Sequence, residues 1–413
     1  MMVRFFATPL PNPNPLPPLP QHAKKNPLPP LPLAVHKADL LAACAALGLE
    51  ASSKRAAFDM LKEHFVDGPA RSLREKAYGI FARAKAEFDD VEKEELLEAC
   101  AALGLEGATS KRSAYELLEA SIKLTGHCVM TLEHEGYVNG LAVLEGGRLV
   151  SGGCEGSHLR VWDPATGVNV ATMVGNGYEI AALPGGRFAA AGGETNEAAV
   201  WDPASPARLI CEYMGHTDKV WCVASLPDNL VASGSTDKTV HIWRADTGAH
   251  IATLQGHTSD VCALAVLSDG RLASGSSDDT VRLWDVSHPA SAPRVLQHGS
   301  GVLALAVLDG GILASGSGVV HLWDVSSASE WPMAVLEGHT QYVHSLAALP
   351  RGLLASGSAD KTVRVWDVAA RTCVAVLQGH KGCVTALAAL PDGRLASGSD
   401  DPSDVIRVWE LRP

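Results

Sequence analysis

Three stretches of the chain contain histidine, serine, aspartate and tryptophan in the same order and at the same spacing. These residues are His216, Ser233, Asp237 and Trp243; His257, Ser274, Asp278 and Trp284; and His339, Ser356, Asp360 and Trp366. Histidine, serine and a carboxylate are the residue types of a nucleophilic triad, in which the histidine activates the hydroxyl. A catalytic triad repeated along a chain would make no sense, however. The recurrence therefore favours a structural role, in which these polar groups satisfy one another's hydrogen bonds.

The tryptophans of these sets belong to a longer repeat, in which each tryptophan is followed by an acidic residue or by arginine. Its members are Trp162, Trp201, Trp243, Trp284, Trp323, Trp366 and Trp409, and the successive steps are 39, 42, 41, 39, 43 and 43 residues. A period of about 40–45 residues with a Trp-Asp dipeptide is the signature of one blade of a β-propeller. The spacing predicts a mainly β fold with seven blades.

The repeat at residues 254–284 matches the pattern most completely and shows why such a unit forms strands. Residues 261–267 are a nearly continuous apolar run, as expected for a strand covered on both faces. Asp269-Gly270 forms a hairpin turn, because glycine adopts positive φ without steric cost. Residues 272–275 form the next strand, and residues 281–284 alternate apolar and polar side chains, as a half-buried strand does.

The pattern resembles the WD-repeat family, which is marked by a Gly-His pair, a Ser-Gly-Ser, a turn aspartate and a Trp-Asp. Gly-His pairs occur at 215–216, 256–257, 338–339 and 379–380. The resemblance covers residues 127–413 and implies a non-enzymatic seven-bladed propeller. It also implies that the histidine, serine, aspartate and tryptophan of a blade form an internal hydrogen-bond chain. Residues 127–132 have no blade of their own, so we expect them to pair with the last blade and close the ring.

Three repeats depart from this pattern. The second has residues 174–178 where the Gly-His loop belongs, and Ala191 stands in place of the serine. The fifth has Gln297-His298 and no turn aspartate, and the first has Glu133-His134. We expect these blades to lose part of the polar chain.

The resemblance implies that partners bind the loops at the mouth of the propeller. The residues expected there are Tyr137, Asn139, Lys219, Trp221, Asp260, Leu303, Tyr342, His344 and Thr385. Trp221 is one of two tryptophans outside the repeat, and tryptophan and tyrosine are frequent binding anchors. The alternative for Trp221 is packing between blades. The other extra tryptophan, Trp331, is expected on the opposite face as a smaller second contact.

Residues 1–35 are expected to form a disordered proline-rich arm. Pro-Leu-Pro-Pro-Leu-Pro occurs twice, at 15–20 and 27–32, and favours an extended polyproline II rod. The core residues of the two copies are Pro17, Pro18, Leu19 and Pro20, and Pro29, Pro30, Leu31 and Pro32. They fit a ligand for proline-recognising modules, such as WW domains. The alternative is a spacer.

Residues 36–126 are expected to be α-helical and contain a second internal repeat. Residues 40–50 return with few changes as 96–106, and a basic pair follows each copy. Each unit resembles the SAP motif, a helical hairpin that binds DNA or RNA, which would place Lys54, Arg55, Lys111 and Arg112 at phosphates. A helix N-terminus does favour an anion. The alternative is a packing or protein-contact role, which the slightly acidic balance of this region favours.

Charge and cysteine usage restrict the function further. Of the net charge of −12, the front segment before His127 contributes nothing, with 16 basic and 16 acidic residues. The propeller carries the whole excess, which disfavours binding of nucleic acid or a membrane surface. The nine cysteines contain no Cys-x-x-Cys pair, which indicates an intracellular reducing compartment, cytoplasm or nucleus, and no zinc site. No phosphate-binding loop or nucleophile elbow is present in the sequence, so we expect neither an enzyme nor a cofactor.

These observations favour a scaffold or adaptor that binds proteins or peptides through its propeller mouth. One alternative is an adaptor tethered to nucleic acid by the SAP-like hairpins. A second is a substrate receptor of a cullin-type ubiquitin ligase, because residues 408–412 resemble the hydrophobic-Trp-acidic-x-Arg docking tail of some WD-repeat receptors. An ordinary last strand accounts for the same five residues.

Overall fold

The computed structural model describes residues 96–97, 110–112, 114, 125–153, 158–204 and 207–412. The proline-rich arm and most of the expected helical region, including Lys54 and Arg55, lie outside these residues. Leu96–Leu97, Lys111–Arg112 and Ala114 are helical, and the amide of Ala114 donates to the carbonyl of Ser110 at 2.9 Å. Within the described part of the chain, no helix has the length and apolar character needed to cross a membrane.

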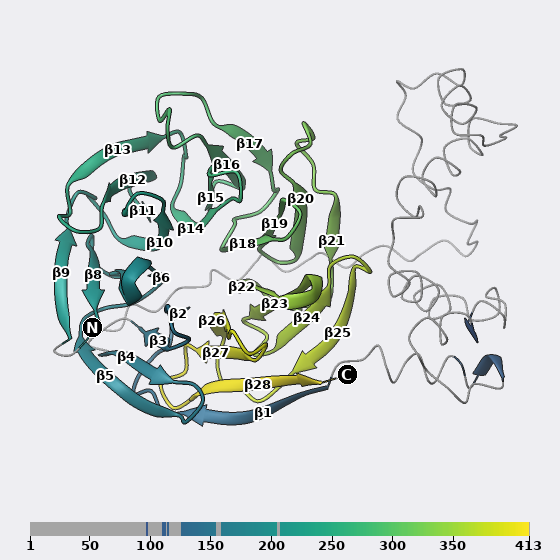
Figure 1. Cartoon of the computed structure of the whole chain (residues 1–413). Helices are drawn as coiled ribbons and strands as arrows, with labels where there is room; N and C mark the ends of the chain where they lie inside the picture. The colour runs from purple at the N-terminus through teal and green to yellow at the C-terminus, as the bar shows by residue number, and fades with distance from the viewer. Residues whose placement is uncertain are drawn as a thin grey trace, which may run out of the picture. The chain divides into compact units, whose positions relative to one another are not determined.

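Residues 125–412 form seven four-stranded antiparallel sheets arranged around a common axis (Figure 1). We number the blades by their inner strands. Blade 1 contains β2 (Gly140–Val143), β3 (Leu149–Gly152), β4 (His158–Asp163) and β5 (Val168–Val174). Blade 2 contains β6 (Ile180–Ala182), β7 (Phe188–Ala191), β8 (Ala198–Asp202) and β9 (Arg208–Tyr213). Blade 3 contains β10 (Val220–Leu226), β11 (Leu230–Ser235), β12 (Thr239–Arg244) and β13 (His250–Gln255).

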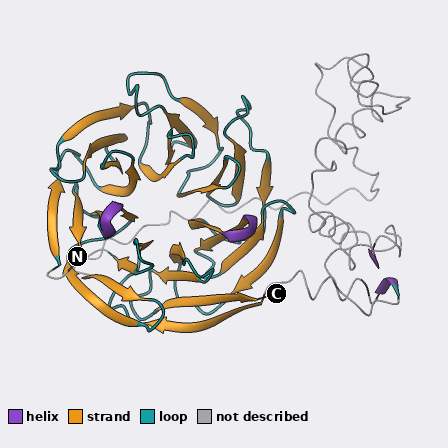
Figure 2. Cartoon of the chain, viewed as in Figure 1, coloured by secondary structure: helices purple, strands orange, loops and turns teal. Residues whose placement is uncertain are grey.

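The remaining blades follow the same order from the axis outward. Blade 4 contains β14 (Val261–Val266), β15 (Leu272–Ser276), β16 (Thr280–Trp284) and β17 (Arg294–Gln297). Blade 5 contains β18 (Ala304–Leu308), β19 (Ile312–Gly316), β20 (Val320–Asp324) and β21 (Ala334–Leu336). Blade 6 contains β22 (Val343–Leu349), β23 (Leu353–Ser358), β24 (Val363–Asp367) and β25 (Thr372–Leu377). Short 3-10 turns, η2 (Pro184–Gly186) and η3 (Pro350–Gly352), follow β6 and β22 (Figure 2). The expected seven-bladed propeller is confirmed.

The ring closes in blade 7, which contains β26 (Val384–Ala389), β27 (Leu395–Ser399), β28 (Ile406–Arg412) and β1 (Thr125–Leu132). Strand β1 pairs antiparallel with β28, and His127 lies opposite Glu410. Blade 7 therefore takes its outer strand from the start of the propeller and its other three strands from the end. This pairing covers the edge that β28 would otherwise expose.

The hydrophobic core lies between neighbouring blades. One cluster joins Cys222 and Ile242 of blade 3 to Val261 and Trp284 of blade 4. The glycine of each Ser-Gly-Ser allows this close approach. A Cβ added to Gly234 would lie only 2.6 Å from Cγ1 of Val261 in the next blade. The repeated glycine thus sets the spacing between sheets, because any side chain there would push the next blade away.

A hydrogen-bond chain ties the loop before each inner strand to its blade. In blade 4, Nδ1 of His257 donates to Asp278 at 2.8 Å, and the hydroxyl of Ser274 lies 2.7 Å from Nε2 of His257. The indole of Trp284 donates to the same hydroxyl at 2.8 Å. The structure brings together the corresponding residues of blade 3 and blade 6 in the same way. These chains fix the loops that form the mouth.

Blade 7 contains a fourth complete chain that the sequence pattern did not reveal. His380 donates to Asp404 at 2.8 Å and lies 2.6 Å from the hydroxyl of Ser397, which also accepts from Trp409 at 2.7 Å. The histidine and aspartate are 24 residues apart, compared with 21 in blades 3, 4 and 6. Compared with those blades, residues 402–404 lengthen the turn of blade 7, and Asp404 in this insertion supplies the carboxylate.

Blade 2 lacks the chain, and its register corrects one sequence-based assignment. Trp243 lies opposite Val231 in blade 3, and Ser233 follows two residues later. In blade 2, Trp201 lies opposite Phe188, so the position of the serine belongs to Ala190 and not to Ala191. The indole nitrogen of Trp201 is buried without a hydrogen-bond partner among the described residues.

Replacing Ala190 with serine is therefore expected to stabilise the propeller by about 1 kcal/mol, since it supplies an acceptor for a buried indole N–H. Urea denaturation would measure the change. The matched control is Ala191→Ser, because Ala191 corresponds to the tightly packed Gly234 and gains no indole partner there. A stabilisation by Ala191→Ser, and none by Ala190→Ser, would refute the register argument.

Candidate protein-binding face

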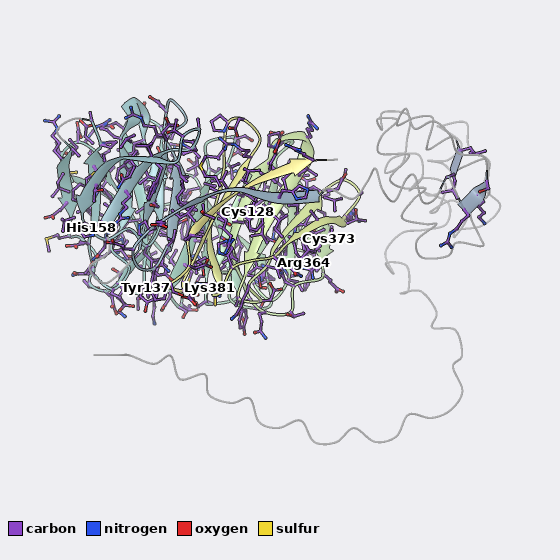
Figure 3. All side chains as sticks on the ribbon, turned by 90° about the horizontal axis from the view of Figure 1, so that it is seen from below. Cys128, Tyr137, His158, Arg364, Cys373 and Lys381 are labelled. Atoms are coloured by element: carbon purple, nitrogen blue, oxygen red, sulfur yellow. The ribbon has the colours of Figure 1, made fainter. Side chains whose placement is uncertain are left out.

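The nine residues predicted at the mouth lie at, or just before, the first residues of inner strands. Because every inner strand runs in the same direction relative to the axis, these residues share one face of the propeller, here called the loop face. Figure 3 shows Tyr137 and Lys381, from the loops before β2 and β26, at the same edge of the propeller. Of the nine, Tyr342 is the most exposed, at 57%, and the others are half-buried.

Blades 2, 3 and 4 contribute a connected aromatic and charged cluster on this face. The rings of Trp221 and Tyr178 meet edge to face with centroids 4.8 Å apart. The ammonium of Lys219 lies 5.6 Å from the centroid of the Trp221 ring and pairs with Glu194 of blade 2. The indole of Trp221 donates to Thr236 at 2.7 Å. Trp221 is thus both a packing residue between blades and a partly exposed surface residue.

The cluster continues to Asp260, which accepts from the hydroxyl of Thr236 at 3.4 Å. On the other side of the ring, His344 of blade 6 faces Asp400 of blade 7, and burial lowers the pKa of His344 despite this carboxylate. The hydroxyl of Thr385 donates to the carbonyl of Val138 at 2.7 Å and joins blade 7 to blade 1. Asn139 and Leu303 occupy the corresponding positions in blades 1 and 5.

The sequence analysis missed Tyr178, although it occupies the same position in blade 2 as Trp221 does in blade 3. The sequence does contain a signal for this position. Leu183-Pro184 ends the inner strand segment of blade 2 as Leu226-Pro227 ends that of blade 3, and aligning the two pairs places Tyr178 opposite Trp221. The analysis relied on the Gly-His pair instead, and blade 2 does not have one. Glu194 was missed as well, because the turn between β7 and β8 lacks the aspartate that marks this turn in the family pattern.

Glu179 is a second unforeseen feature of blade 2. Burial raises the pKa of Glu179 to about 8, although the carboxylate accepts a hydrogen bond from the backbone of Val223. The equivalent positions in the other blades carry only small side chains, namely Gly140, Cys222, Ala263, Ala304, Ser345 and Ala386. The cost of placing a charge in this buried position, beside the backbone of Val223 in the neighbouring blade, is the cause of this raised pKa.

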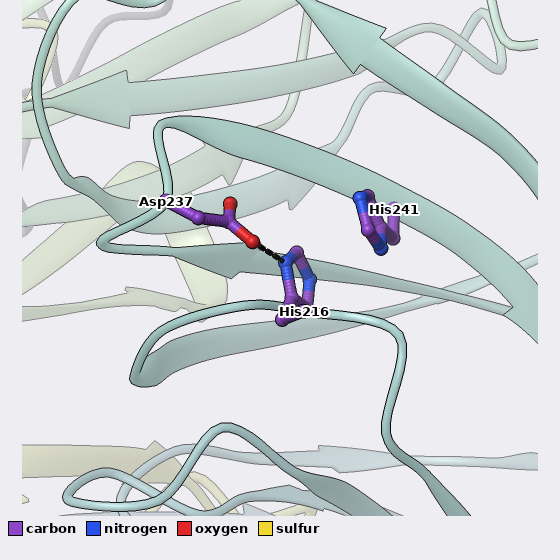
Figure 4. A group of neighbouring side chains, drawn as sticks. All are labelled: His216, Asp237 and His241. Atoms are coloured by element: carbon purple, nitrogen blue, oxygen red, sulfur yellow. Dashed lines mark hydrogen bonds and ion pairs between the residues drawn. The ribbon is translucent and has the colours of Figure 1, made fainter.

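Blade 3 contains a cluster of metal-binding residue types that sequence spacing did not reveal. The ligand atoms of His216, Asp237 and His241 lie within 4.8 Å of one another (Figure 4). However, Nδ1 of His216 donates to Asp237, and Nε2 of His216 lies 2.9 Å from the hydroxyl of Ser233. Nδ1 of His241 lies 2.8 Å from the hydroxyl of Tyr213.

The orientation of the two rings also disfavours a shared metal ion. The rings of His216 and His241 are stacked, with centroids 3.9 Å apart and planes inclined by 12°. Each imidazole lone pair lies in the plane of its ring. Because the two rings are stacked, their lone pairs lie in nearly parallel planes and do not converge on one metal ion. We therefore assign this cluster to the hydrogen-bond network that holds blade 3 together.

The remaining sequence-predicted sites are placed as follows. Lys111 and Arg112 lie in a helical turn, whereas Lys54, Arg55 and both proline motifs lie outside the described residues. Residues 408–412 are part of β28, which pairs with β27 on one side and β1 on the other. Within this segment, Val408 and Trp409 pair with both β27 and β1, whereas residues 410–412 pair with β1.

The fold and the loop face define a β-propeller interaction platform. The sequence model described as WD domain, G-beta repeat matches residues 126–163, 207–244, 248–285, 330–367 and 371–410. The stretches between these matches include the repeats of blades 2 and 5, which lack part of the polar chain. The propeller is therefore a WD-repeat propeller, a type that is generally a non-catalytic scaffold for protein interactions. A comparison with curated protein sequences gives no match.

Proposed function

We propose that the protein is a non-enzymatic adaptor whose loop face binds a protein or peptide. The observation that supports this function best is the cluster of Tyr178, Lys219 and Trp221. Two aromatic rings and a charged pair from adjacent blades meet there, on a rigid support of hydrogen-bonded loops. Aromatic side chains with restricted rotamers bind at low entropic cost, which makes them effective anchors.

Tyr342 of blade 6 lies on the same face and is mostly exposed. A partner that contacts both regions would cross the mouth of the propeller. The described polar residues that recur from blade to blade are engaged in structural hydrogen bonds, which supports a binding role in preference to catalysis.

Replacing Trp221 with alanine is expected to weaken partner binding by at least tenfold, about 1.4 kcal/mol, since it removes the central ring of the cluster. Quantitative pull-down of partners from cell extract by the full-length chain, followed by titration of the strongest one, would measure the loss. Tyr342→Ala should weaken the same interaction.

The matched control is Val168→Ala, which removes an exposed apolar side chain at the first residue of the outer strand β5, away from the loop face. Circular dichroism and thermal unfolding of each variant would separate lost binding from lost folding, because Trp221 also packs against Tyr178. If folded Trp221→Ala and Tyr342→Ala chains retain every partner, the loop face is not the binding site.

A further inference from the structure

Charge is distributed unevenly between the two faces of the propeller. The loop face is formed by the connections that lead from outer to inner strands and by those that join second to third strands. Among the described residues, these connections hold 14 acidic residues, besides Glu179, whose pKa is raised by burial, against only four lysines. The connections on the opposite face hold eight acidic residues against six arginines. Most of the negative charge of the propeller loops therefore lies on the loop face.

Four arginines of the third strands approach the loop face, but they do not reverse its charge. They are Arg160, Arg282, Arg364 and Arg407. Arg160 already pairs with Glu135 at 3.0 Å, and Arg407 pairs with Asp404 at 3.4 Å. With all four included, eight basic residues stand against the 14 acidic ones. The loop face therefore carries a negative surplus whose sign does not depend on any single ion pair.

The acidic residues are dense around the aromatic pair Tyr178 and Trp221. The loop-face connections of blades 2, 3 and 4 hold seven of the 14 acidic residues, against two lysines. Among these seven, Asp218 is exposed and Asp260 is half-buried. The carboxylate of Asp260 accepts a hydrogen bond from the hydroxyl of Thr236 at 3.4 Å. Within the described part of the chain, no lysine, arginine or histidine lies within ion-pair distance of Asp260.

The ring of Trp221 already attracts a cation of the propeller itself. The ammonium of Lys219 lies 5.6 Å from the centroid of this ring, within the range of a cation–π contact. Lys219 also pairs with Glu194 of blade 2, whereas Asp260 belongs to blade 4. Trp221 of blade 3 thus has an acidic side chain in each neighbouring blade, and Lys219 neutralises one of the two. A further cation at Asp260 would break no ion pair of the propeller.

We infer that the loop face binds a basic segment of a partner protein, with one lysine or arginine against the Trp221 ring and the Asp260 carboxylate. This inference rests on the proposed function and adds the chemical class of the partner. The ring supplies contact area and a cation–π attraction, and the carboxylate supplies a charge-assisted hydrogen bond. The surrounding acidic residues accelerate the encounter and make it dependent on salt. A nucleic acid or an acidic peptide would be repelled from this face.

The test is selection of peptides from a randomised displayed library on the full-length chain, followed by titration of the most enriched labelled peptide. The enriched peptides should carry an excess of lysine and arginine. Their affinity should fall about tenfold or more when these residues are replaced by glutamine, and should weaken as ionic strength rises. Asp260→Asn should lower the affinity about threefold or more, because it removes the charge and keeps an oxygen that accepts from Thr236.

Asp309→Asn is the matched control for the loss of charge. It makes the same substitution at an exposed aspartate in a turn of the opposite face, so it should leave the affinity unchanged. Trp221→Ala should weaken binding of the same peptides about tenfold. Asp260→Asn retains both aromatic rings, so it remains informative if Trp221→Ala disturbs the fold.

The outcomes separate this inference from the proposed function. If Trp221→Ala weakens binding but the enriched peptides carry no basic excess, or are insensitive to Asp260→Asn, the loop face is a binding site and the inference of a basic partner is overturned. If the peptides bind the Trp221→Ala and Asp260→Asn chains as tightly as the unchanged chain, both proposals fail. The inference is also overturned if no peptide is enriched.

Discussion

Replacing Trp243 with alanine is expected to lower the free energy of unfolding by about 3–5 kcal/mol, the usual cost of removing a fully buried tryptophan. Trp243 is 0% exposed. Its indole donates to Ser233 at 3.1 Å, and its ring stacks on Tyr213 with centroids 4.9 Å apart. The substitution therefore leaves a cavity and removes one member of the hydrogen-bond chain. Urea denaturation followed by circular dichroism would measure the loss.

Trp331→Ala is the matched control for this experiment. It removes the same side chain from a position that is 71% exposed, so the free energy of unfolding should change by no more than about 0.5 kcal/mol. Similar losses for the two variants would contradict the assignment of Trp243 to the core between blades.

The second large effect is a loss of stability in acid. Burial lowers the pKa of His134, His241 and His298 from 6.5 to about 4. Their folded-state pKa lies below the unfolded value, so the unfolded chain takes up protons first. The contribution of these histidines is fully present above pH 6.5 and is lost as the pH falls toward 4. The combined loss is expected to be on the order of several kcal/mol.

The aspartates of the hydrogen-bond chains act at lower pH. Burial alone would raise the pKa of Asp278, but hydrogen bonds from Thr280, from the backbone of Thr258 and from His257 lower it to about 2. Its contribution is present above pH 3.8 and is lost below that value. Histidines and aspartates therefore destabilise the fold in succession as the pH falls.

Urea denaturation midpoints measured from pH 7.5 down to about 4.5 would test the histidine contribution: the midpoint should stay level above about pH 6.5 and fall below it. His298→Gln should start from a lower midpoint and lose less on acidification, since a group that titrates in this range is gone. A midpoint that does not change with pH would show that the buried histidines do not govern acid stability.

The number of blades was predictable because six of the seven repeat the same physical requirements, and blade 2 keeps the Trp-Asp dipeptide. A tryptophan must meet a buried serine, and a glycine must allow the next sheet to approach. Where these requirements are met with an altered spacing, prediction fails. Asp404 completes the chain of blade 7 from within an insertion, and Ala190 occupies the serine position although Ala191 appears aligned in the sequence. Register depends on strand pairing, which a linear pattern specifies only to within a residue or two.

The binding surface was less predictable than the fold. Lys219 and Trp221 stand out because they follow a Gly-His pair, whereas Tyr178 and Glu194 come from a blade that has neither a Gly-His pair nor a turn aspartate. Residues that touch across two blades do not recur at a fixed spacing within the repeat, so the repeat pattern does not predict these contacts. For the same reason the sequence does not reveal the pocket of about 660 Å³ between blades 4 and 5, since its walls combine a turn of one blade with a long connection of the next.

The pairing of β1 with β28 has a consequence for the synthesis of the protein. Thr125 leaves the ribosome long before its partner Arg412. Strand β1 therefore has no pairing partner while six complete blades are synthesised. Until then both β1 and the growing outermost sheet carry unpaired backbone groups, which are available to other nascent chains. The final strand therefore both completes blade 7 and ends the period in which the chain is most prone to aggregate.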